Sequence, residues 1–119
     1  MLCDYATVSE NKLTLVGGGW HWCGASAPGY YLGVFVEVEQ IAEQRVSELT
    51  LDLVDQNEQI VATSSLELQL RSGLGETIPA AVLVPAMQLE PGSSYEWRAY
   101  IDGEGDQEWV CRFKTREMA

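Results

Sequence analysis

Basic residues are scarce in this chain: seven lysines and arginines stand against eighteen aspartates and glutamates, which gives a net charge of −11. A domain this acidic repels phosphate backbones, so we expect no nucleic-acid partner. No run of residues approaches the roughly 20 apolar residues that span a bilayer, and we expect no membrane partner. The first five residues, Met1 to Tyr5, lack the basic-then-apolar profile of a secretion signal, so we expect a cytoplasmic protein.

Metal ligands of the kind that form zinc sites are also few. The cysteines Cys3, Cys23 and Cys111 are widely spaced, no Cys-x-x-Cys pair occurs, and His21 is the one histidine. A structural zinc site needs four such ligands at short paired spacings, so we expect no bound metal. A Cys3–Cys111 disulfide is compatible with neighbouring first and last strands, but it would not persist in a reducing cytosol.

Sequence signatures of catalysis are missing as well. No Gly-x-Ser-x-Gly or His-Glu-x-x-His motif occurs, and the glycines 17–19 precede no lysine of a phosphate loop. The acids Asp102, Glu104 and Asp106 suit a charged hairpin tip better than a calcium loop. We therefore expect a protein without enzyme activity or cofactor.

What the chain has is alternation of apolar and polar residues. The 119 residues, 46% of them apolar, suffice for one domain with one core, here residues 1–119. Period-two runs predict a closing hairpin over 95–101 and 109–113, around a glycine-rich loop. Further strands are predicted at 2–9, 12–16, 31–39, 46–54, 59–70 and 78–84, with a polar connector or single helical turn at 40–45. The prolines Pro79 and Pro85 favour an edge position for the strand at 78–84.

These signals predict an all-β fold: a single antiparallel β-sandwich of about eight strands, immunoglobulin-like or fibronectin-III-like. The stretch Leu89-x-Pro91-Gly92-x-x-Tyr95 resembles the tyrosine corner of such domains. The side chains predicted to form one core between two sheets are Leu32, Val34, Val36, Leu49, Leu51, Leu53, Leu66, Leu68, Tyr95, Trp97, Trp109, Cys111 and Phe113.

A glycine-bounded loop carries more aromatic residues than the core explains. It holds Trp20, His21 and Trp22, with Tyr30 and Tyr31 at its far end. Aromatic side chains on a loop of a rigid scaffold suit contact with a partner. Alternatively, Trp20 and Trp22 continue a strand and cover the open end of the sandwich.

Four of the seven basic residues fall in the closing hairpin, and a basic stripe there would receive an acidic partner, a further copy of the chain included. Alternatively, these residues pair with acids within the sheet. A loop at 103–105 places Asp102 opposite Asp106, and it sets Glu96 opposite Arg112 and Tyr100 opposite Glu108. This register leaves three basic side chains without a directly opposite acid: Arg98, Lys114 and Arg116.

Two groups of motifs resemble a family of small uncharacterised all-β proteins of bacteria and their phages. The opening group is Leu2-Cys3-Asp4-x-Ala6-x-Val8, then Lys12-Leu13, then Val16-Gly17-Gly18-Gly19-Trp20. The later group is Leu51-x-Leu53-x-Asp55 and Pro91-Gly92-x-x-Tyr95-x-Trp97-Arg98. The resemblance implies a stand-alone domain without a known enzyme activity, and it brings no catalytic residues to carry over.

Two functions stay open on the sequence. The first is a non-enzymatic structural or assembly module that docks on itself or on a larger particle, such as a phage virion. The second is an intracellular binding domain that recognises a protein, a peptide or a sugar through the loop 20–31 and its aromatic side chains.

Overall fold

The computed structural model describes residues 1–10, 12–26, 28–39, 43–71, 73 and 75–117. These residues form strands and no helix, which confirms the all-β prediction; the connector at 40–45 lies partly outside them. Within these described residues there are ten strands rather than about eight. They are β1 (Leu2–Cys3), β2 (Tyr5–Ser9), β3 (Lys12–Val16), β4 (Trp22–Cys23), β5 (Tyr30–Val38), β6 (Arg45–Asp55), β7 (Ile60–Leu70), β8 (Glu76–Val84), β9 (Ser94–Ile101) and β10 (Glu104–Thr115). No helix in the described part of the chain is long and apolar enough to cross a membrane.

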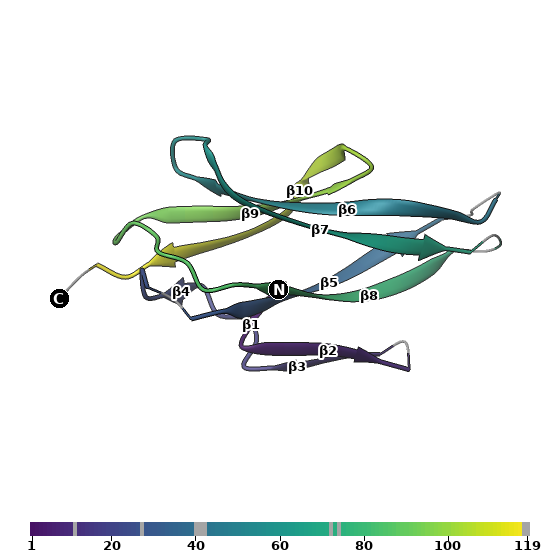
Figure 1. Ribbon diagram of the computed structural model, residues 1–119, viewed down its shortest axis with the longest axis horizontal. Helices are drawn as coiled ribbons and strands as arrows, with labels where there is room; N and C mark the ends of the chain where they lie inside the picture. Colours follow the sequence, from purple (N-terminus) through teal and green to yellow (C-terminus); the bar gives the residue numbers. More distant parts are fainter. Residues whose placement is uncertain (11, 27, 40–42, 72, 74, 118–119) are drawn as a thin grey trace.

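The strands form three sheets rather than the predicted two. A five-stranded sheet, in the order β4-β10-β9-β6-β7, packs face to face with a three-stranded sheet, β1-β5-β8 (Figure 1). The β2–β3 hairpin lies on the outer side of β5 and β8 as a third layer. β8 is an edge strand, as its prolines predict, and Pro79 pairs with Phe35 of β5.

The third sheet arises because the predicted strand at 2–9 breaks at Asp4. Leu2 and Cys3 pair with β5, and the chain then turns outward to form β2. Gly33 of β5 allows the hairpin to lie so close, because a Cβ there would come within 2.7 Å of the Leu15 side chain. Leu15 therefore packs over glycine on the outer face of β5.

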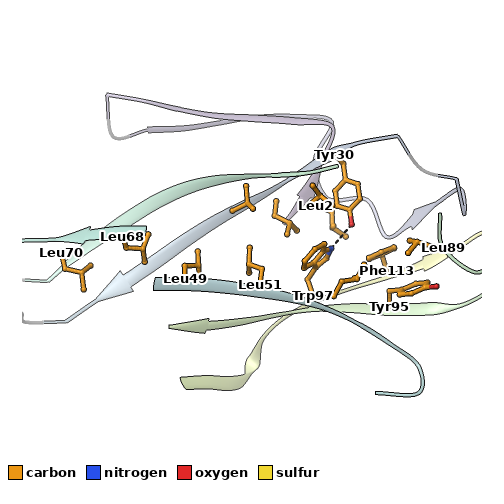
Figure 2. Close-up of a cluster of buried hydrophobic side chains, with 14 residues drawn as sticks. Leu2, Tyr30, Leu49, Leu51, Leu68, Leu70, Leu89, Tyr95, Trp97 and Phe113 are labelled. Carbon is orange, nitrogen blue, oxygen red and sulfur yellow. Dashed lines mark hydrogen bonds between the residues drawn. The ribbon is translucent and has the colours of Figure 1, made fainter. Parts of the chain in front are cut away.

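One core fills the space between the two larger sheets, and its two ends differ in chemistry (Figure 2). Leucines from β6 and β7 occupy one end, and aromatic side chains gather at the other. Between the sheets, the indole N–H of Trp97 donates a hydrogen bond of 2.9 Å to the Tyr30 hydroxyl. Burial raises the pKa of Tyr30, so this phenol stays neutral.

Most of the predicted core is confirmed. Eight side chains are buried: Leu32, Leu49, Leu51, Leu53, Leu68, Tyr95, Trp97 and Phe113. Four are only partly buried against them: Val34, Val36, Leu66 and Cys111. The pattern missed several buried residues: Leu2, Cys3, Ala6, Tyr30, Leu70, Val82, Val84 and Leu89.

The prediction for Trp109 is wrong, since 46% of this residue is exposed. The hairpin turns through two residues, Asp102 and Gly103, both with positive φ, rather than through a loop at 103–105. Tyr100 therefore faces Gly105 instead of Glu108, and Asp102 sits in the turn instead of facing Asp106. A register shift before Val110 adds unpaired residues to β10 and moves Trp109 out of the alternating pattern.

Nearer the base of the hairpin the predicted register is confirmed. Glu96 lies opposite Arg112, and Arg98 lies opposite Val110. At the stretch 89–95, the Tyr95 hydroxyl accepts a hydrogen bond of 2.9 Å from the backbone N–H of Glu90.

Replacing each of two tryptophans by alanine tests this corrected core. Trp97→Ala removes a side chain that is 2% exposed and orphans the Tyr30 hydroxyl, so we expect a loss of about 3–5 kcal/mol in unfolding free energy. Trp109→Ala serves as the matched control and should cost less than about 1 kcal/mol. Urea unfolding measures both. Equal losses would contradict the bulge and restore Trp109 to the core.

Candidate functional site

The aromatic segment at 20–31 divides between the core and the surface. Trp20 packs edge-to-face on Tyr30 with ring centroids 5.2 Å apart, and on Phe113 at 6.1 Å. Tyr30 is buried. Tyr31 lies elsewhere, on the outer side of β5, where its ring contacts Tyr5 at 5.2 Å. Trp20 and Tyr30 therefore serve the core, and Tyr31 belongs to a different face.

Trp22, by contrast, is 55% exposed. Its strand, β4, runs parallel to the end of β10 with Trp22 beside Lys114. The backbone carbonyl of His21 accepts a hydrogen bond of 2.8 Å from the Lys114 N–H. The Lys114 ammonium lies 5.7 Å from the centre of the Trp22 ring, within range of a cation–π interaction. An exposed tryptophan is thus held on paired strands rather than on a free loop.

A hollow of about 520 Å³ lies beside Trp22, between β4, β9 and β10 on one side and the β6–β7 turn on the other. We call this surface the Trp22 face; it is defined by His21, Trp22 and the charged side chains of Asp55, Glu58, Glu96, Arg98, Arg112 and Lys114. The fold therefore brings together four of the predicted contact residues. Arg116 is exposed outside the hollow, where its N–H donates to the Cys23 carbonyl.

The predicted basic stripe is largely neutralised. Arg98 forms ion pairs with Glu58 and Glu96, each at 2.8 Å. It also lies opposite Asp52 of the neighbouring strand β6. Arg112 contacts Glu96 at 2.7 Å. Hydrogen bonds from Arg98 lower the pKa values of Glu58 and Glu96, and those two acids raise the pKa of Arg98. The sequence missed this pairing because Glu58 and Asp52 come from a different hairpin.

Potential metal ligands do not converge. Within the described residues, no group of three or more His, Cys, Asp or Glu side chains is placed to hold a metal ion. The three cysteines are free thiols, and burial raises the pKa values of Cys3 and Cys23. Asp102 instead accepts a hydrogen bond of 2.8 Å from the Glu48 N–H, which lowers its pKa.

A larger groove of about 890 Å³ opens along the other side of the sandwich, between β5 and the β9–β10 hairpin. We call it the open groove. Its walls are apolar and come from both sheets: Val34, Val36, Val38, Leu49, Leu70, Ala99, Ile101 and Trp109. Alternation alone marks these residues as inward-facing, and it holds no signal that the space between the sheets stays open.

Comparisons with known proteins assign no family to this chain. No protein-family model and no curated protein sequence matches the chain. Among solved structures, the chain is similar to part of a beta-glucuronidase from glycoside hydrolase family 2, with 18% identity and a TM-score of 0.47. The likeness covers 93% of this chain and 10% of that one. The chain thus spans about a tenth of that enzyme's length, and this likeness assigns it no activity.

The ion pairs on the Trp22 face predict a pH-dependent stability. Glu96→Gln should lower the unfolding free energy by about 1 kcal/mol at pH 7, because Glu96 accepts hydrogen bonds from two arginines. Its pKa is lowered in the folded state, so its contribution is fully present above the unfolded pKa of about 4.3 and is lost as the pH falls through the lower folded-state pKa. Denaturation between pH 3 and pH 7, with exposed Glu43→Gln as control, measures the difference. A difference as large at pH 3 as at pH 7 would contradict the pairing.

Proposed function

We propose that this chain is a non-enzymatic assembly module that docks on another protein through the Trp22 face. The observation that supports it most is the exposed Trp22 ring, carried on a strand paired with β10 and with Lys114 beside it. Tryptophan is the residue type most enriched among binding hot spots, and a rigid side chain loses little entropy on binding. The partner is a further copy of the chain or a larger particle, and the resemblance to phage proteins favours a virion.

The fold type is part of the same proposal. The hydrogen bond between Tyr95 and Glu90 supports an immunoglobulin-like or fibronectin-III-like sandwich, since such domains tie this corner in the same way. A cytoplasmic protein that joins a virion during assembly fits both the acidic composition and the resemblance.

The charges of the Trp22 face favour an acidic partner patch. Arg98 and Arg112 are already paired with Glu58 and Glu96, so docking need not neutralise them. Lys114 contacts the Trp22 ring and forms no ion pair within the described residues. A carboxylate of the partner would complement it.

A peptide- or sugar-binding domain is the second candidate. The hollow of about 520 Å³ falls within the range of small-molecule sites, and the exposed Trp22 ring offers a flat surface on which a sugar stacks. Titration of saccharides against tryptophan fluorescence distinguishes the two functions, because an assembly module should show no saturable change.

Two tryptophans that are two residues apart test the proposal. Trp22→Ala should weaken docking by about 2 kcal/mol and leave the melting temperature nearly unchanged, because the ring is exposed. Trp20→Ala is the matched control: it removes contacts with Tyr30 and Phe113 and should lower unfolding free energy by about 2–3 kcal/mol.

Sedimentation of each variant measures the docking. Wild-type protein should self-associate at high concentration, or co-sediment with a particle in the producing cell, and Trp22→Ala should remain a free monomer. Added salt distinguishes the partners, because salt screens charges. Two copies of the chain, each of charge −11, repel one another, so their association should strengthen with salt. Docking that depends on attraction between Lys114 and an acidic patch of another protein should weaken with salt. Unchanged sedimentation of Trp22→Ala would contradict the proposal.

A further inference from the structure

The β5 strand has a free edge where it borders the open groove. β1 covers that edge only as far as Gly33, whose N–H donates to the Met1 carbonyl at 2.8 Å. Backbone groups alternate between the two sides of a strand, so Phe35 and Glu37 also point away from β8. The pairing of Phe35 with Pro79 agrees, because proline has no N–H to offer to β5. Beyond Gly33 the described residues place no strand on this side of β5.

The open groove beside this edge is apolar inside. Val34, Val36 and Val38 line it from β5, and Ala99 and Ile101 line it from β9. All five are only partly buried, although they face the core. The stretch 34–38 is about 16 Å long at 3.3 Å per residue, which matches an added strand of five or six residues. Alternate side chains of such a strand would enter the groove and bury this surface.

The rim of the groove is acidic on both walls. Glu37 and Glu39 lie on the β5 side, and Glu104 and Glu108 lie on the β10 side. Among the described residues that line the groove, Arg45 is the one lysine or arginine. The Met1 ammonium adds a positive charge at the Gly33 end, where it donates a hydrogen bond of 2.8 Å to the Gly33 carbonyl. Within the described residues, no ion pair involves the four glutamates. An added strand therefore meets carboxylates on both sides, and lysine or arginine at its outward positions would complement them.

We propose that the open groove binds an extended segment of another protein, in which apolar residues alternate with basic ones, and that this segment pairs with the free edge of β5. This segment belongs to a protein on which the chain docks, so the inference rests on the docking function proposed above. It adds a second contact surface, distinct from the Trp22 face.

A second copy of the chain is a poor occupant. The sequence 110–116, Val-Cys-Arg-Phe-Lys-Thr-Arg, does alternate in the required way. Phe113 and Thr115 of that stretch are buried in their own core, however, so the stretch is not free to leave it. The remaining surface of the chain is acidic overall, and the rim would repel it.

Binding of synthetic peptides tests the inference. An eight-residue peptide of alternating valine and lysine should bind the wild-type protein, and its valine–glutamate counterpart should bind at least about tenfold more weakly. Titration calorimetry measures both affinities. Glu104→Gln combined with Glu108→Gln should weaken the lysine peptide about threefold to tenfold and reduce its salt dependence.

Two proline variants test the edge itself. Phe35→Pro removes the N–H that the added strand needs; Phe35 is 61% exposed and this N–H faces away from β8, so the fold should persist. Leu83→Pro is the matched control on β8, at an outer-face residue that is 58% exposed. Phe35→Pro should weaken the lysine peptide at least about tenfold, and Leu83→Pro should leave it within about twofold. If Phe35→Pro does not fold, the glutamate variants decide.

Failure of this inference is distinguishable from failure of the docking function. The inference is overturned if the two peptides bind equally, if neither binds more tightly than about 1 mM, or if the folded Phe35→Pro protein binds like wild type. Loss of peptide binding in Trp22→Ala, with Phe35→Pro unaffected, would move the peptide to the Trp22 face. That result would contradict peptide binding in the open groove, and it would still agree with the proposed docking function.

Discussion

The hydrogen bond between Trp97 and Tyr30 ties the two larger sheets together, and the shape of the molecule depends on it. Trp97 belongs to the five-stranded sheet and Tyr30 to the three-stranded sheet, so the bond of 2.9 Å spans the core. Both polar atoms are buried, and either would cost free energy without the other. Phe113 stacks on Tyr95 and contacts Tyr30, and Trp20 covers this group from the side. The aromatic end of the sandwich is therefore closed and rigid.

At the opposite end, no hydrogen bond between described side chains joins the two larger sheets, and the open groove lies there. β1 has two residues and covers only the first part of β5. The β9–β10 hairpin is bulged before Val110, so Trp109 stands at the mouth of the groove instead of filling it. The two proposed contact surfaces thus lie at different places: the Trp22 face beside the aromatic end, and the open groove where the sheets stay apart.

The sequence predicted the secondary structure well, because period-two alternation reports directly which strand face is apolar. It placed Leu49, Leu51 and Trp97 correctly for this reason. It failed at Trp109, since a bulge shifts the alternation without a signal of its own. For the candidate site, it selected Trp22 and Lys114, which the fold brings together. The pairing of Arg98 with Glu58 and the free edge of β5 both depend on long-range register, which composition and spacing do not encode.

Amide hydrogen exchange along β5 tests most directly the central claim that the sandwich is closed at one end and open at the other. Val34 and Val36 point their N–H groups toward β8, whereas Phe35 and Glu37 point theirs toward the groove. We expect slow exchange at Val34 and Val36 and exchange on the order of a hundred times faster at Phe35 and Glu37. Equal, slow exchange at all four amides would mean that a strand already covers this edge, and it would contradict the account.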